Sequence, residues 1–440
     1  MIYLILLNTG SLIYLYYGDV KMYRKTLTVI VLVAIMLFIF GCSPQSHSDG
    51  DGVSAGYSPG ANTGELELTY RPVTKEDGSK FTIGFLDLDP YPLTGQMLYD
   101  VIVSLKADGW INYDSLPFDR DNIDSQKLIK YLSEQDLGPY LQFSKTLNYY
   151  FFVDYEDELN GLPEADGIDD EFERMLFALD NVLQRSADAK DVDILLAWST
   201  SMASMASAYS DSMAVVAFIT DAVGSGVVEG LEYSGVPNVW AHTDDQRYKR
   251  QMQVFKEVFD FGKMGVVYSD RRVAVIADYE EMAETLNVEL AEKQMEQLDG
   301  GSAEDLEKYI KSFAGGVADL LTNDKIDAFL LTTDMIKSEE QLDSLISLCN
   351  EFNVPVFVQI GDEFVEKGAL MTVQLLDSSV GNFIAHAIGK ILNGVKPEEI
   401  MQYHLSMPYL SLNIDAARKL GVKVPFEMLM SSEKIYGGMR

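Results

Sequence analysis

The sequence predicts an α/β protein with two Rossmann-like lobes, each built on a parallel sheet, behind an export signal and a spacer. Three features support this fold class: short apolar runs alternate with amphipathic helical stripes, the alternation forms two series, and a last stripe follows the second series. Such alternation is typical of βα units on parallel sheets. The last stripe indicates that the chain returns, so we expect several crossovers between the lobes and a cleft between them.

Composition narrows the class of protein. The 440 residues, 47% of them apolar, are enough for about three domains of roughly 150 residues. With 34 basic and 68 acidic residues the formal charge is −34, and so acidic a surface repels phosphate backbones, which argues against a nucleic-acid partner. Two cysteines exclude a disulfide scaffold and a four-cysteine metal site within one chain. The four histidines lie far apart, so we expect no metal and no cofactor.

The N-terminal region has the pattern of a secretory signal. Residues 26–41 carry no charge, and the basic side chains before them are Lys21, Arg24 and Lys25. A basic stretch, an apolar run and small Gly41 at its end are typical of an export signal. A plain membrane anchor is the alternative, although residues 26–41 are short for a hydrocarbon core of about 30 Å.

We assign residues 1–41 to the signal region and expect translation to start at Met22, because Tyr-Arg-Lys after it is a normal beginning for such a signal. The residues 39–42, Ile-Phe-Gly-Cys, resemble a bacterial lipobox, which implies that Cys42 is acylated and becomes the mature N-terminus. Two acyl chains would anchor the protein stably. Residues 42–79 are rich in Ser, Gly, Pro and Asp, and they are predicted to form a flexible tether.

The first lobe follows from four buried-strand runs. Strands are predicted at residues 81–86, 149–153, 192–197 and 214–219. Apolar stripes predict helices at residues 97–105 and 175–183, and small residues after Thr200 predict a third. The segment 154–173 holds ten acidic residues and no basic one, so we interpret it as an inserted, solvated loop.

The second lobe repeats the pattern. Strands are predicted at residues 264–268, 328–331 and 356–359, and helices at residues 252–259, 306–320 and 342–352. Residues 273–277 are ambiguous between a strand and a helix start. Cys349 lies on an apolar helix face, which favours a buried hydrophobe over a nucleophile. The last stripe, residues 380–392, ends at Asn393-Gly394. The predicted boundaries place residues 80–238 and 378–400 in the first lobe and residues 239–377 and 401–430 in the second.

Ligands of open α/β sheets bind beyond the carboxyl ends of the strands, so polar residues there are candidates. Ser199 and Thr200 precede a helix, and their hydroxyls and the free amides could hold a carboxylate, although one of them could simply cap the helix. Thr220 and Asp221 follow the next strand and could orient a polar group or form a turn. Asp89 ends the first strand and has the same two interpretations.

The second lobe contributes Thr333 and Asp334 at the end of its strand 328–331. Asp334 could pair with a ligand ammonium; helix capping is the alternative, but Ser338 with Gln341 already supplies a capping box. Trp198 and Trp240 could enclose an aromatic or cationic ligand, or serve only in packing.

Several segments together resemble a known family. They are Thr-Asp-Ala-Val-Gly-Ser-Gly-Val-Val at 220–228, Thr-Thr-Asp at 332–334, Glu-Lys-Gly-Ala-Leu at 366–370 and the closing run at 412–425. In this order they resemble the tryptophan/tyrosine-type substrate-binding lipoproteins of ABC uptake transporters over residues 81–428. The turn that this family commonly has at its first crossover, Gly-Gly-Asn-Val-Thr-Gly, is replaced by residues 235–241.

The resemblance implies a type I periplasmic-binding-protein fold with three crossovers. It also implies a monomer, moored by lipid outside the cytoplasm, that traps a small organic ligand, often an amino acid. A permease and an ATPase on separate chains would be its partners, and it would have no enzymatic activity. For residues 273–277 it implies a helix.

Two other functions compete with this interpretation. A surface sensor of the same fold would bind ligand without transport. Asp87-Leu88-Asp89 after a strand also resembles the start of haloacid-dehalogenase phosphatases, in which the first aspartate is the nucleophile, but the lysine and magnesium carboxylates of that chemistry have no convincing place. The absence of Gly-x-Ser-x-Gly and Gly-x-x-x-x-Gly-Lys motifs supports neither a serine hydrolase nor an ATPase.

Overall fold

The computed structural model describes most of the chain beyond residue 69. The described residues are 4–6, 12–14, 70–90, 92–120, 123–160, 162–219, 222–244, 246–269, 273–296, 298, 302–332, 335–374, 378–404 and 409–438. The chain divides into two compact units, Met1–Leu66 and Glu67–Arg440. In the first, strands β1 (Leu4–Leu6) and β2 (Leu12–Tyr14) pair antiparallel. The apolar run 26–41, Met22, Cys42 and the tether up to residue 69 lie outside the described residues. Within the described part, no helix is long and apolar enough to cross a bilayer.

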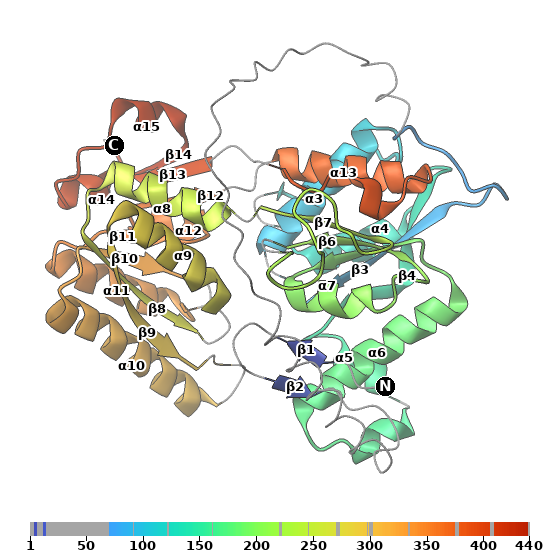
Figure 1. Cartoon of the computed structure of the whole chain (residues 1–440), viewed down its shortest axis with the longest axis horizontal. Helices are drawn as coiled ribbons and strands as arrows, with labels where there is room; N and C mark the ends of the chain where they lie inside the picture. The colour runs from blue at the N-terminus through green and yellow to red at the C-terminus, as the bar shows by residue number, and fades with distance from the viewer. Residues whose placement is uncertain are drawn as a thin grey trace, which may run out of the picture. The chain divides into compact units, whose positions relative to one another are not determined.

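The second unit contains two sheets, each with its own helices, which we call the first and second lobes (Figure 1). The sheet of the first lobe has five parallel strands in the order β4-β3-β5-β6-β7. Its strands are β3 (Phe81–Asp87), β4 (Leu141–Tyr150), β5 (Ile194–Trp198), β6 (Ala214–Phe218) and β7 (Val239–His242).

Helices cover both faces of this sheet and form two apolar cores. On one face lie α3 (Pro92–Ala107), α4 (Ser125–Glu134) and the returning α13 (Ser378–Leu392). On the other face lie α5 (Tyr155–Leu159), the 3₁₀ helix η2 (Pro163–Gly167), α6 (Glu171–Ala189) and α7 (Thr200–Ser207). Since strands with helices on both faces are buried on both sides, they are continuous apolar runs rather than alternating ones.

Helix α13 packs closely against α3 because glycine lies at their contact. A Cβ at Gly381 would lie 2.5 Å from the Cβ of Asp100 and 3.0 Å from the backbone nitrogen of Val101. At Gly389, near the other end of α13, a Cβ would lie 2.9 Å from the Cβ of Tyr70. Glycine is therefore needed at 381 for the close approach of α13 to α3, and at 389 for the close approach of α13 to Tyr70.

The sheet of the second lobe has seven strands in the order β14-β13-β12-β11-β10-β8-β9. Neighbouring strands are parallel except β12 and β13. The strands are β8 (Lys263–Ser269), β9 (Glu289–Met295), β10 (Ala328–Leu331), β11 (Val356–Val358), β12 (Met371–Gln374), β13 (Tyr409–Asn413) and β14 (Ser432–Tyr436).

Two cores again flank this sheet. One includes α8 (Arg247–Val258), α9 (Val273–Leu286), α14 (Ile414–Lys419) and α15 (Phe426–Ser431). The other includes α10 (Ala303–Asp319), the π-helical turn η4 (Leu320–Asp324), α11 (Glu339–Glu351) and α12 (Asp362–Glu366). The short 3₁₀ helix η5 (Pro397–Glu399) follows α13.

The chain passes three times between the sheets: after β7, after β12 and after η5. The predicted fold class, two lobes with parallel sheets joined by three crossovers, is confirmed. The prediction that residues 273–277 start a helix is confirmed by α9. Burial of Cys349 on α11 is also confirmed, and burial raises the pKa of its thiol to about 12.

Three local predictions need correction. The strand expected at residues 149–153 is instead β4, which ends at Tyr150, because a bulge between Phe143 and Asn148 interrupts its apolar pattern. The acidic segment is not a plain loop but contains α5 and η2, since Tyr155 and Leu159 of α5 enter the core. The first sheet has a fifth strand, β7, so the chain leaves this sheet after His242 rather than at residue 238.

Residues 70–79 of the predicted tether contact the first lobe. The Trp110 indole donates to the carbonyl of Tyr70 at 2.8 Å, and the Asn393 amide donates to the carbonyl of Arg71 at 2.9 Å. Lys75 forms an ion pair with Asp193 at 2.8 Å. The described fold of this unit therefore begins before the first strand.

Candidate ligand-binding site

One row of side chains closes the carboxyl edge of the first sheet. Each of the five strands ends at the same level, with Tyr150, Asp87, Trp198, Phe218 and His242 side by side in the order of the sheet. Asp87 pairs in register with Tyr150, Trp198 with Phe218, and Phe218 with His242, while Asp87 and Trp198 directly follow the pair Leu86–Ala197. Residues in register on neighbouring strands point to the same face, so these five form a continuous terminal row.

The terminal row is largely aromatic and buried. The ring centroids of Trp198 and Phe218 are 5.6 Å apart, and those of Phe218 and His242 are 5.5 Å apart. Phe85, one layer below, contacts Tyr150 and Trp198 at 5.7 and 5.4 Å. Such tilted ring pairs stabilise a rigid platform beyond their area of burial.

Burial disfavours the charged forms of the polar members of the terminal row. Burial raises the pKa of Asp87 to about 7, although hydrogen bonds from the Leu88 N–H and the Thr94 hydroxyl act to lower it. Burial, helped by the nearby His404 and Arg247, lowers the pKa of His242 to about 3, although the Ile219 backbone slightly favours its charged form. The Tyr150 hydroxyl donates to the Ser125 hydroxyl at 3.0 Å. Near neutral pH the row therefore presents neutral His242 and Tyr150 beside a partly ionised Asp87.

Three members of the terminal row have polar atoms without a hydrogen bond among the described residues, and the first is Asp87 through its Oδ2. Nε1 of Trp198, whose side chain is 0% exposed, has no acceptor among the described residues. His242 is 2% exposed, and neither Nδ1 nor Nε2 makes a hydrogen bond of good geometry in the described part of the chain, although the Ile219 backbone interacts weakly with the ring. Leaving a buried polar group unpaired costs about 1–3 kcal/mol, so these atoms mark a place where a ligand group would be favoured.

Ser199 and Thr200, both predicted ligand residues, directly follow the terminal row. Ser199 caps α7 because its hydroxyl accepts from the Met202 N–H at 3.4 Å, and its φ of 77° lies in the left-handed region. A non-glycine residue there carries local strain, which is common at functional sites. Thr200 begins α7 and is partly exposed, with its carbonyl bonded to the Ser204 hydroxyl at 3.0 Å.

The other predicted residues lie in different surroundings. Asp89 is exposed, two residues past the end of β3. Trp240 is 0% exposed, and its indole donates to the Met401 carbonyl at 3.0 Å while its ring lies 5.4 Å from that of Phe383. These contacts give Trp240 a packing role between β7, α13 and the third crossover. Four further predicted ligand residues and the lipidation site lie outside the described residues: Thr220, Asp221, Thr333, Asp334 and Cys42.

Charged residues of the first crossover were missed by the sequence interpretation. Asp244 is 1% exposed and receives a hydrogen bond and ion pair from Arg250 Nη2 at 2.5 Å. Arg247, in the first turn of α8, is also buried. Had β7 been predicted, its end at His242 would have directed attention to these residues. With only four residues and with Pro237 just before it, β7 has too weak a strand pattern to be predicted.

In the second lobe the carboxyl ends of the strands are tied together by one glutamine. The Gln251 amide donates to the carbonyls of Gln359 and Val373, each at 2.7 Å, and its carbonyl accepts from the Tyr279 hydroxyl. The Thr332 hydroxyl, after β10, donates to the Val267 carbonyl at 3.4 Å. Helix α8 is thereby fixed against the ends of β11 and β12.

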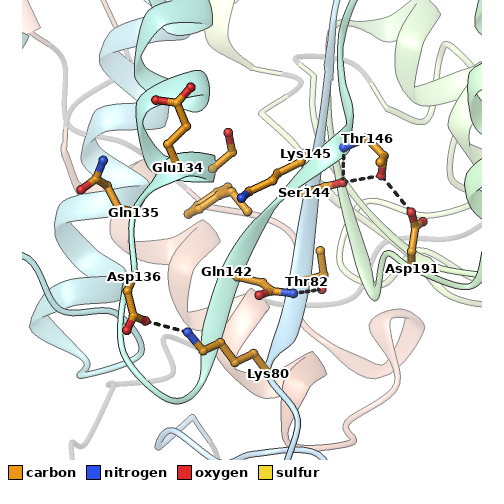
Figure 2. A pocket seen from close by; sticks show the side chains of 12 residues that line it. Lys80, Thr82, Glu134, Gln135, Asp136, Gln142, Ser144, Lys145, Thr146 and Asp191 are labelled. Atoms are coloured by element: carbon orange, nitrogen blue, oxygen red, sulfur yellow. Dashed lines mark hydrogen bonds and ion pairs between the residues drawn. The ribbon is translucent and has the colours of Figure 1, made fainter.

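A hollow of about 480 Å³ lies at the opposite edge of the first sheet (Figure 2). Lys80 and Thr82 line it at the start of β3, and Gln142 lines it at the start of β4. Lys145, from the β4 bulge, also lines the hollow (Figure 2). Lys80 forms an ion pair with Asp136 at 2.7 Å. No member of the terminal row lines this hollow, so it is separate from the edge where ligands of such sheets bind.

Comparison with known proteins identifies the family. Residues 177–436, more than half of the chain, match the family described as ABC transporter substrate binding protein. A search of curated proteins found no match.

Solved structures share the fold over most of the chain. A conserved domain protein from Vibrio cholerae has a TM-score of 0.56 at 17% identity, and an ABC domain in complex with L-Trp from Streptococcus pneumonia has 0.54 at 16%. A ligand-free, open substrate-binding protein with adhesive properties from Clostridium difficile has 0.54 at 19%. Each alignment covers 81% of this chain and 100% of the other. The chain belongs to the ABC transporter substrate-binding protein family and has its two-lobed type I periplasmic-binding fold.

Proposed function

We propose that this protein captures a small α-amino acid between its two lobes and presents it to an ABC permease, whose ATPase is a separate chain. The single observation that carries the proposal is the terminal row, where a buried aromatic platform places the unpaired Trp198 Nε1 and His242 at the carboxyl ends of a parallel sheet. The structure of the same fold from Streptococcus pneumonia, which was solved in complex with L-Trp, supports the ligand class.

Ser199 and Thr200 extend this surface with hydroxyls beside the N-terminus of α7. In the second lobe, Thr333 and Asp334 follow β10, where Asp334 would receive the ligand ammonium. Thr220 and Asp221 would contribute from the end of β6, and Asp89 from the end of β3. The aromatic platform itself is Trp198 with Phe218, whereas Trp240 supports it from within the core.

Binding drives closure through differential affinity. A ligand that touches both lobes only when they are closed stabilises the closed state, and shifting 1:99 to 99:1 requires about 5.5 kcal/mol. Charge-assisted hydrogen bonds of roughly 1.5–3 kcal/mol each are sufficient in small number. We expect no enzymatic role, because the lysine and magnesium carboxylates that a phosphatase needs beside Asp87 have no convincing place in the sequence.

We further propose that the protein acts as a monomer outside the cytoplasm, moored through acylated Cys42 and a tether that begins there. Metabolic labelling with a palmitate analogue tests the anchor: a Cys42→Ala variant should lose the label and enter the soluble fraction. Equal labelling of the variant would exclude this mooring.

Thermal shift and calorimetric titration of the second compact unit, residues 67–440, with the twenty L-amino acids test the function. A ligand at one hundred times its Kd stabilises a folded protein by about 2.7 kcal/mol, which is readily measured. If no amino acid stabilises the unit at millimolar concentration, the proposed ligand class is wrong.

A further inference from the structure

Polar atoms without partners also gather at the start of the first crossover, next to the terminal row. Oδ1 of Asp244 is buried and unpaired among the described residues, although its Oδ2 is bonded to Arg250. Nε and Nη1 of Arg250 are likewise shielded from solvent and unpaired in the described structure. With His242 two residues earlier, one short segment holds three side chains with incomplete hydrogen bonding.

These groups lie close together. Asp244 and Arg250 are in direct contact at 2.5 Å. Arg247 is near enough to His242 to disfavour its charged form, and Arg247 and Arg250 are neighbours on the same face of the first turn of α8 because they are three residues apart. Because Asp244, which contacts Arg250 directly, follows His242 by two residues, Arg250 and His242 both lie near the end of β7.

The arrangement is poor as a purely structural ion pair. A buried ion pair stabilises a fold only when further hydrogen bonds satisfy its remaining atoms, and here both partners keep unpaired atoms. An arginine fixed by one carboxylate through Nη2 presents its other N–H groups in a fixed direction, which suits recognition of a second carboxylate. His242 can add an N–H donor, and because its ring is neutral it does not repel the nearby Arg247 and Arg250.

We infer that the first crossover is an acid-recognition site, in which Arg250 and His242 donate hydrogen bonds to a carboxylate of the ligand while Asp244 holds Arg250 in position. The inference rests on the proposed function and assigns the ligand's acidic group to residues outside the predicted set. Trp198 Nε1, two strands away in the terminal row, is left for another polar group of the same ligand.

Calorimetric titration with matched probes tests the site. The probes are L-tryptophan and tryptamine, and L-leucine and 3-methylbutylamine, which differ only by the carboxylate. Arg250→Lys keeps a cation for Asp244 but loses the guanidinium N–H groups, so it should weaken binding of the amino acid at least tenfold and leave that of the amine unchanged. His242→Gln should weaken the amino acid at least threefold. Arg418→Lys, in an exposed ion pair with Asp415, is the matched control and should change nothing.

The outcomes separate this inference from the proposed function. If the wild-type protein binds neither amino acid nor any of the other eighteen, the proposed function fails and the site with it. If it binds one of them and both crossover variants bind within twofold of wild type, the acid-recognition site is wrong while the function stands. An equal loss for amino acid and amine in folded Arg250→Lys would assign Arg250 a structural role and also overturn the inference. Circular dichroism and melting temperature establish folding of each variant.

Discussion

Replacing Gly381 by alanine is expected to destabilise the first lobe. The added Cβ would lie 2.5 Å from Asp100 Cβ and 2.8 Å from its carbonyl carbon, both on α3. Since carbon atoms normally pack at about 3.5–4.0 Å, the two helices would have to separate by roughly 1 Å. Because the contacted atoms are a Cβ and backbone atoms, which cannot move aside, overpacking should cost about 2–3 kcal/mol, the upper part of its usual range, and the better helix propensity of alanine offsets about 1 kcal/mol of that. A net loss of about 1–2 kcal/mol would lower the melting temperature by roughly 2–8 °C.

The same substitution at Gly315 is the matched control. Gly315 lies inside α10, where an added Cβ meets nothing within 4 Å, so alanine should stabilise the second lobe by up to about 1 kcal/mol. Differential scanning calorimetry of both variants measures the two effects. A Gly381→Ala protein that melts at or above the wild-type temperature would refute the close-packing argument for α13.

Three further outcomes are expected. In the unfolded chain a histidine has a pKa near 6.5, whereas burial lowers the pKa of His242 to about 3; the unfolded state therefore binds more protons between these values, and stability falls as pH falls from about 6.5 to 3. His242→Gln should flatten that part of the urea-unfolding profile, and an unchanged slope would contradict the assignment. Because burial raises the pKa of Cys349 to about 12, its thiol should react with a thiol reagent only after denaturation, and rapid labelling of native protein would show it accessible. Trp240→Phe leaves the Met401 carbonyl without its donor and should cost about 1–3 kcal/mol by denaturant titration, with a loss below about 0.5 kcal/mol contradicting the packing role.

The lobes could be predicted because most of their strands are continuous apolar runs between striped helices. Residues 264–268 and 328–331, for example, lie within or match β8 and β10. Strands β4, β7, β9, β12, β13 and β14 escaped prediction wholly or in part. Two of them have a clear physical reason for a weak pattern. Strand β4 is divided by a bulge in which the Ser144 hydroxyl accepts from the Thr146 and Leu147 N–H groups, and β7 has only four residues.

The candidate site was only partly predictable for the same reason. Trp198, Ser199 and Thr200 follow a strong strand, so their place at the carboxyl edge could be read from the pattern. His242 could not be placed because it ends the short β7. Arg250 lies among charged residues in the first turn of α8, a pattern that indicates a solvent-exposed helix face. Their importance depends on burial and on unpaired atoms, which arise from packing between segments far apart in the chain.

The placement of tryptophan gives this protein a built-in optical reporter. All three indoles, Trp110, Trp198 and Trp240, are fully buried and belong to the core that includes α3 and α13. Intrinsic fluorescence should therefore be blue-shifted and should follow the first lobe alone, with Trp198 as the emitter nearest the terminal row. Comparing that emission with a signal from the whole chain, such as far-ultraviolet dichroism, would show whether the two halves melt as one or in sequence.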